Sequence, residues 1–197
     1  MVFDGRNKVI SLPQTILQPI HSLAEAAYPA ECCGLVLKFQ GEGPEQWRLW
    51  PVCNIQDEMH RRFPAEFPRT SHNAYWMDPL ELLGAHKALR PCTNVQGRRN
   101  RRLKKSSYSG LRRRDHQDPA SVPESLYSGR PAKIAVIYHS HPDAEAFFSA
   151  EDERLALDDL GQPLYPEAFY LVVPVRQGKA GEARFFCWSA ARRKFQS

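Results

Sequence analysis

Residues 133–141 read KIAVIYHSH, a β-branched apolar run that ends in two histidines two positions apart. Such a run predicts a strand. Side chains at positions i and i+2 of a strand point to the same face of the sheet, so His139 and His141 project together. Pro142 follows and ends the strand, because proline cannot donate to the ladder. The sequence therefore predicts a pair of imidazoles at the end of a strand.

Helices and strands alternate along the rest of the chain. We expect helices over 13–28, 78–90 and 150–160 and strands over 31–40, 46–55, 133–141, 168–175 and 183–190. Ser11 is a candidate cap for the first helix, and Pro19 indicates a start near that proline. Residues 56–77 are polar and predict a long loop with one short strand. The alternation predicts one α/β domain with a mixed sheet layered against helices.

Composition favours a soluble globular protein. The chain has 197 residues, of which 42% are hydrophobic and 25% charged. It shows no signal-peptide pattern and no apolar run long enough to span a membrane, so we expect a cytoplasmic protein without a membrane contact. The five cysteines are an odd number without a CxxC spacing. They predict reduced thiols rather than a disulfide framework or a cysteine zinc site.

The positive charge is concentrated in residues 91–130, which hold ten Lys or Arg and three acidic residues. The net charge of this segment is +7. Because the net charge of the whole chain is +5, the remaining residues together carry −2. We favour a disordered or mobile loop for it. Docking of an acidic partner is the second hypothesis. Nucleic-acid binding is the least favoured, because Tyr108 alone is a poor platform for stacking bases.

A third ligand for the histidine pair is available in the next helix. Asp152 lies in the first turn of that helix, and two histidines with one carboxylate are typical of a catalytic zinc site that keeps one position open. The same ligands suit other divalent metals, and a lone HxH can also be a hydrogen-bonded pair. Ser149 and Asp152 also fit a helix capping box. Glu31, at a helix-to-strand junction, is the candidate base, although taken alone it reads as a surface carboxylate.

The combined pattern is more specific than its parts. Glu31, the HSH of 139–141, seven intervening residues, and the SxxD that runs from Ser149 to Asp152 resemble the JAMM/MPN+ metalloprotease family, the metal-dependent deubiquitinases and their bacterial relatives. PAECCG at 29–34 is similar to the start of the short bacterial members. The resemblance covers residues 1–90 and 131–197, and every position of the family pattern is present, including Ser140.

The resemblance implies a curved mixed sheet between helices, a layered architecture similar to that of cytidine deaminase. It implies that His139, His141 and Asp152 hold Zn²⁺, that Glu31 activates a water, and that Ser149 stabilises the oxyanion. The implied reaction is hydrolysis of a peptide or isopeptide bond after the C-terminal Gly-Gly tail of a ubiquitin-like or sulfur-carrier protein.

Two alternatives stay open. One is a peptidase that trims a carrier protein's C-terminus and releases an amino acid such as cysteine. The other is a non-catalytic scaffold of the same fold. A nucleoside deaminase is excluded because its P-C-x-x-C ligand pair is absent. We expect residues 1–197 to form one catalytic domain, interrupted by the basic insertion at 91–130. The sequence indicates neither an oligomeric state nor the natural substrate.

Overall fold

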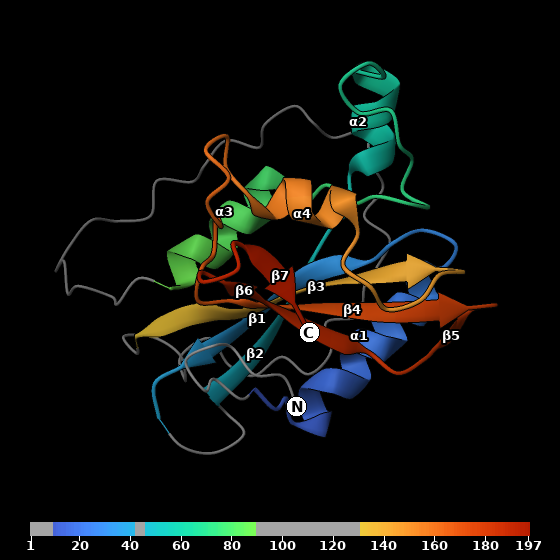
Figure 1. Cartoon of the computed structure of the whole chain (residues 1–197). Helices are drawn as coiled ribbons and strands as arrows, with labels where there is room; N and C mark the ends of the chain where they lie inside the picture. The colour runs from blue at the N-terminus through green and yellow to red at the C-terminus, as the bar shows by residue number, and fades with distance from the viewer. Residues whose placement is uncertain (1–9, 42–45, 90–130) are drawn as a thin grey trace, which may run out of the picture.

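A computed structural model describes residues 10–41, 46–89 and 131–197 of the chain (Figure 1). Within these residues, the strands form one seven-stranded sheet in the order β2-β1-β3-β4-β6-β7, and β5 pairs with β4. The strands are β1 (Cys33–Phe39), β2 (Trp47–Val52), β3 (Ala132–Pro142), β4 (Phe169–Arg176), β5 (Lys179–Ala180), β6 (Arg184–Ser189) and β7 (Lys194–Gln196). The predicted α/β class with a mixed sheet is confirmed.

Strand β3 lies in the middle of the sheet and is its longest strand. It pairs antiparallel with β1 and parallel with β4, and the register with β1 shifts between Val36 and Leu37. Nine consecutive residues from Ile134 to Pro142 are buried. A strand that is covered on both faces reads as a continuous apolar run, which is why the sequence predicted β3 well. The two histidines are thus carried by the most enclosed strand of the protein.

Helices cover both faces of the sheet (Figure 1). Helix α1 (Gln14–Ala27) packs through Ile16, Ile20 and Ala24 against the face that holds Val136 and Tyr138. Helices α3 (Pro79–Ala88) and α4 (Ala150–Ala156) lie over the other face, where Ala85 and Ala156 join a second apolar cluster with Ile137, Tyr170 and Val172. The two clusters are separated only by the sheet, so the domain has a three-layered core.

The first helix departs from the prediction at its start. It begins at Gln14 and runs through Pro19, and Pro13 rather than Ser11 occupies the N-cap position. Pro19 has no backbone N–H, so it removes one hydrogen bond within the helix. The buried stripe of Ile16, Ile20 and Ala24 extends over both sides of Pro19. Burial of this stripe outweighs the lost bond, so the expectation of a start near Pro19 was wrong.

The polar segment 56–77 is not wholly a loop, contrary to the prediction. Helix α2 spans Gln56–Arg62, and Gln56 is its one buried residue. Such a helix has no apolar stripe for a periodicity argument to detect. Its charges do carry a signal, since Asp57 and Glu58 stand in the first turn and basic residues fill the last turn. This order complements the helix dipole. The expected short strand is reduced to a bridge between Asn54 and Met77.

The remaining predicted elements are present with small changes. Asp78 caps α3 by accepting a hydrogen bond from the Leu80 amide at 2.7 Å, and Pro79 is the first helical residue. Helix α4 ends at Ala156, earlier than the predicted residue 160. The basic segment 91–130, predicted to be a mobile loop, lies outside the described residues. In the part of the chain that is described, no helix has the length and apolarity of a membrane span.

Gly34 in β1 provides a test of the packing between the central strands. A Cβ atom at this position would lie 2.5 Å from the Tyr138 hydroxyl and 2.6 Å from the Trp50 carbonyl oxygen. We expect Gly34→Ala to lower the free energy of unfolding by about 3 kcal/mol, because the backbone of β2 cannot move away without breaking the sheet. Urea unfolding followed by circular dichroism measures this change.

Gly84→Ala is the matched control. Gly84 lies in α3, and the nearest atom to its added Cβ is the Trp50 ring at 3.4 Å. Alanine in a helix is favoured over glycine, so this variant should be about 0.5–1 kcal/mol more stable than the wild type. Equal stabilities for the two variants would contradict the packing described for Gly34.

Candidate metal centre

The two histidines project from the last part of β3 into the layer below α4. His139 is fully buried and His141 is 5% exposed. Ser140 lies between them and points to the opposite face, where its hydroxyl accepts a hydrogen bond from the Cys32 amide at 2.8 Å. The alternation predicted from the HSH sequence is therefore observed. After Pro142 the chain turns at Asp143, which has a positive φ of 54°.

Asp152 reaches the histidines because of the way helix α4 begins. Ser149 is the N-cap, and its hydroxyl accepts a hydrogen bond from the Asp152 amide at 3.1 Å. The Asp152 Oδ2 atom accepts in turn from the Ser149 amide at 2.7 Å. This reciprocal capping box fixes the carboxylate at the first turn of the helix. Asp152 is only 3% exposed and faces the imidazoles.

The three side chains converge on one small volume. The Nε2 atoms of His139 and His141 lie 3.1 Å apart, and they lie 3.0 Å and 3.4 Å from the two carboxylate oxygens of Asp152. Burial alone would raise the pKa of Asp152. The charge and hydrogen bonds of the two histidines outweigh burial and hold that pKa well below its usual value. The carboxylate is therefore ionised at neutral pH.

The surroundings of the rings indicate which nitrogens face the cluster. His141 Nδ1 lies 3.1 Å from the Glu145 carbonyl oxygen, which can only accept, so Nδ1 donates and the neutral ring keeps a lone pair on Nε2. The His139 ring stacks on Tyr75 with centroids 4.7 Å apart. Its Nδ1 is buried and has no hydrogen-bond partner among the described residues. Both Nε2 atoms are thus held toward Asp152 by packing and by one backbone bond.

This donor set fits a divalent metal ion. Ligand atoms from His139, His141 and Asp152 all lie within 4.8 Å of one another. Tetrahedral zinc with bonds of about 2.0–2.1 Å places its ligand atoms roughly 3.3–3.4 Å apart, close to the 3.0–3.4 Å found here. Two imidazole nitrogens and a carboxylate that face one another are also the donor types that a divalent cation such as zinc takes. The cluster could therefore hold a metal.

Glu31 lies at the same end of the sheet, two residues before Cys33, which pairs with His139. It is 5% exposed, and its Oε2 atom has no hydrogen-bond partner among the described residues. Burial and the negative charge of Asp152 raise the pKa of Glu31 well above its usual value, and the positive charge of Arg69 opposes them. The structure thus brings the Glu31 carboxyl group close enough to the His139, His141 and Asp152 cluster for their charges to interact.

Asn54 holds Glu31 in place, and the sequence did not single it out. Its amide nitrogen donates to the carbonyl oxygens of Glu31 at 2.9 Å and Ala74 at 3.3 Å. Its amide oxygen accepts from the backbone N–H groups of Gln56 and Trp76, each at 3.0 Å. One side chain therefore uses all four of its hydrogen-bonding positions. An asparagine between a strand and a polar segment carries no pattern that predicts this role.

The fold and the cluster together define a class: a mixed-sheet α/β domain with a buried His-His-Asp group at the end of its central strand. The family model described as prokaryotic homologs of the JAB domain matches residues 13–189. This chain belongs to that family, which confirms the JAMM/MPN assignment predicted from the motif.

A solved structure with a TM-score above 0.5 supports the fold. The chain is similar to the solution structure of protein DSY2949 from Desulfitobacterium hafniense, with 21% identity and a TM-score of 0.54 over 95% of this chain and 88% of that one. The solution structure of a protein from Salinibacter ruber matches with 16% identity and a TM-score of 0.44 over 93% of this chain and 84% of that one. A search of curated proteins found no match to the chain.

Metal content tests the cluster directly. We expect the purified protein to retain one divalent ion per chain after dialysis, and His141→Ala and Asp152→Asn to lose it, because each removes one of three ligands. Elemental analysis by mass spectrometry measures the ion. His86→Ala is the control, since His86 bonds to Tyr165 far along the sequence and has no place in the cluster. Retention of the ion in all three variants would place the metal elsewhere.

The role of Asn54 is tested by Asn54→Ala. This change leaves two backbone N–H groups and the Glu31 carbonyl without their partner, so we expect the free energy of unfolding to fall by about 2 kcal/mol. Asn73→Ala, at an exposed position of the same segment, should change it by no more than about 0.5 kcal/mol. Thermal and urea unfolding give both values. An Asn54→Ala protein as stable as the control would show that Asn54 does not organise this segment.

Proposed function

We propose that this protein is a metal-dependent peptidase or isopeptidase. Its substrate is a ubiquitin-like or sulfur-carrier protein, cut after the C-terminal Gly-Gly tail. The observation that carries the proposal is the pairing of a buried His-His-Asp cluster with Glu31, a buried carboxyl group that has an unpartnered oxygen. A buried ionisable group with a strongly shifted pKa beside a ligand cluster is typical of an active site.

His139, His141 and Asp152 hold the metal in this proposal, and zinc is the ion that suits the ligand set best. When bound, the ion supplies Lewis-acid polarisation of the scissile carbonyl and makes a water more acidic. The capping box that orients Asp152 and the carbonyl bond that orients His141 keep these ligands in place. Ligand orientation by such neighbours supports metal affinity and reactivity.

Glu31 is the proposed general base and acid. It accepts a proton from the attacking water, whose oxygen bonds to the scissile carbonyl carbon. It then gives the proton to the amine nitrogen as the carbon–nitrogen bond breaks. The raised pKa of Glu31 supports this role, because a carboxyl group with a pKa nearer neutrality both accepts and returns a proton more readily.

Ser149 is the proposed oxyanion donor. Its oxygen already accepts a hydrogen bond from the Asp152 amide, so its own hydroxyl proton remains available to donate. Ser149 is half-buried at the start of α4, beside the ligand that follows it by three residues. Donation to the developing oxyanion would stabilise the transition state more than the ground state.

Two substrate arrangements fit this chemistry. Removal of a protein conjugate and removal of a single C-terminal residue both place a diglycine tail on the acyl side of the bond. The absence of side chains lets such a tail lie in a narrow groove and pair along an exposed strand edge. The basic segment 91–130 remains a proposed contact for an acidic partner.

Glu31→Gln tests the mechanism. We expect this variant to keep its bound metal but to cleave at a rate about 10²–10⁴-fold lower than the wild type, because the amide cannot take up a proton. Substrates are Gly-Gly carrier proteins with C-terminal extensions and with lysine-linked conjugates, and products are read by intact mass. Glu66→Gln, at an exposed position, is the control and should cleave normally.

A chelated wild-type sample completes the test. Loss of cleavage in the chelated protein and in Glu31→Gln, with recovery on adding zinc to the former alone, supports the proposal. Cleavage that persists in Glu31→Gln would exclude Glu31 as the base. Stoichiometric metal without cleavage of any substrate would favour the scaffold alternative.

A further inference from the structure

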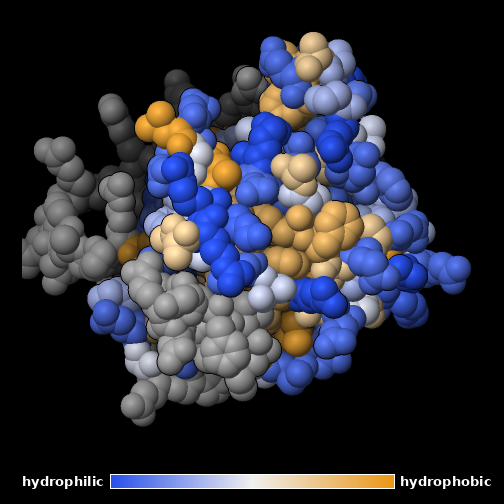
Figure 2. Space-filling model, viewed as in Figure 1, coloured by the Kyte–Doolittle hydropathy of each residue, from blue (hydrophilic) through white to orange (hydrophobic). Residues whose placement is uncertain are grey.

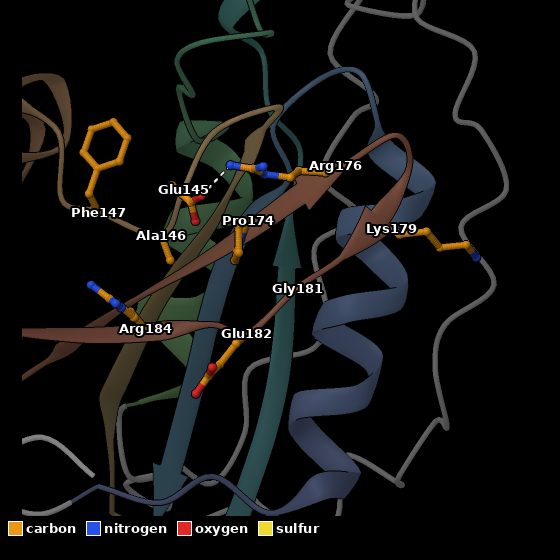
Figure 3. A pocket seen from close by; sticks show the side chains of 9 residues that line it. All are labelled: Glu145, Ala146, Phe147, Pro174, Arg176, Lys179, Gly181, Glu182 and Arg184. Carbon is orange, nitrogen blue, oxygen red and sulfur yellow. Dashed lines mark hydrogen bonds and ion pairs between the residues drawn. The ribbon is translucent and has the colours of Figure 1, made fainter.

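Figure 3 shows a hollow lined by residues of β4, β5 and β6 and of the segment that follows β3. In the sheet order these strands lie on the opposite side of β3 from β1, which Glu31 precedes. The volume of the hollow is about 470 Å³, within the range of small-molecule and peptide sites. The inference below rests on the proposed function and names a feature of the substrate that this function leaves open. The lining residues that matter are Phe147, Pro174, Gly181 and Arg184.

Sheet register places Arg184 on the same face as the metal ligands. His139 in β3 is aligned with Val172 in β4, and Val172 is paired with Arg184 in β6. Residues aligned across neighbouring strands point to the same side, and neighbouring strands are about 4.8 Å apart. The Arg184 backbone therefore lies roughly 10 Å from that of His139, and its side chain rises from the same surface.

Phe147 lines the hollow and also contacts His141, one of the three side chains of the His-His-Asp cluster. Phe147 packs edge-on against the His141 ring, with centroids 5.1 Å apart, and is itself about half exposed. Gly181 has no side chain to cover the Pro174 ring, from which an added Cβ atom would lie 3.3 Å away. Figure 2 shows hydrophobic residues gathered on the visible face in the region between α4 and β4. A substrate chain at the metal can thus pass over an apolar floor toward Arg184.

The charges of the lining leave Arg184 available for an anion. Arg176 is paired with Glu145 across the rim. In Figure 3 the Lys179 side chain points away from the hollow, and Arg184 and Glu182 point in different directions. Among the described residues, none forms an ion pair or a side-chain hydrogen bond with Arg184, which remains exposed. A guanidinium in this position matches a planar carboxylate.

We propose that this hollow, through Arg184, binds a carboxylate on the part of the substrate that is released. The diglycine tail on the acyl side has no carboxylate, so one bound near the metal belongs beyond the scissile bond. An extended chain rises about 3.4 Å per residue, so the first or second released residue spans the distance to the guanidinium. The group is either a free C-terminal α-carboxylate or an acidic side chain at these positions.

Peptide binding to the inactive Glu31→Gln protein tests the proposal. The zinc-loaded protein is titrated with three carrier-tail peptides. The first ends in Gly-Gly-Ala and has a free α-carboxylate, and the second is the same peptide with an amidated C-terminus. The third ends in Gly-Gly-Asp and is also amidated, so its only terminal carboxylate is the aspartate side chain. Titrations are followed by isothermal calorimetry or NMR. We expect at least one carboxylate peptide to bind about tenfold or more tightly than the amidated Gly-Gly-Ala peptide. Tighter binding of the free-acid peptide identifies an α-carboxylate, and tighter binding of the aspartate peptide identifies a side chain.

The same titrations on Glu31→Gln/Arg184→Gln assign the effect to Arg184. The preference should disappear in this variant, be partly kept in Glu31→Gln/Arg184→Lys, and be unchanged in Glu31→Gln/Arg192→Gln, which removes another exposed arginine. Equal binding of all three peptides overturns the proposal. A preference that survives Arg184→Gln also overturns it, because the carboxylate then sits on the metal or elsewhere.

Failure of the proposed function gives a different pattern. If the wild type cleaves no carrier substrate but the carboxylate preference depends on Arg184, the hollow is a binding site and the hydrolytic role is wrong. If the wild type cleaves and Arg184→Gln lowers kcat/KM equally for free-acid and amidated substrates, the hydrolytic role stands and the carboxylate subsite is wrong.

Discussion

The close approach of three potential metal ligands inside the core is the constraint on which the site depends. The Nε2 atoms of His139 and His141 and the carboxylate of Asp152 lie 3.0–3.4 Å apart in a buried space. A divalent cation placed between them could be bound by all three. The most buried strand of the sheet carries two of the groups, and a capping box carries the third. A strand in the core and a capped helix start therefore hold the three side chains in an arrangement that could bind a metal.

The proposed base is held by a separate part of the chain. Glu31 precedes β1, and Asn54 and Ser140 anchor the backbone around it. The ligands and Glu31 therefore meet only when β1 pairs with β3, a contact between segments about a hundred residues apart. A chain assembled in this way closes its site in the same step that forms the centre of the sheet. Gly34 matters for the site because it lies in β1, where Tyr138 and Trp50 occupy the space that a Cβ atom would need.

Local patterns in the sequence predicted the strand, the histidine pair and the S-x-x-D turn, because each depends on neighbours within a few residues. Helix α2 was missed because only Gln56 of its seven residues is buried, so the helix shows no periodic pattern of buried apolar residues. The bonds of Asn54 and the alignment of Arg184 with His139 depend on tertiary pairing, which no local pattern encodes. Pro19 misled the prediction because packing of Ile16 and Ile20 outweighs one lost hydrogen bond.

One measurement tests the central claim, hydrolysis after Gly-Gly, most directly. The zinc-loaded protein is incubated with a Gly-Gly carrier that has a C-terminal extension, in water labelled with heavy oxygen, and the products are read by intact mass. The account predicts a carrier that ends at Gly-Gly and has gained one heavy oxygen atom at its new carboxylate. An uncut carrier in the presence of fully metal-loaded protein, with every extension and conjugate supplied, would contradict it.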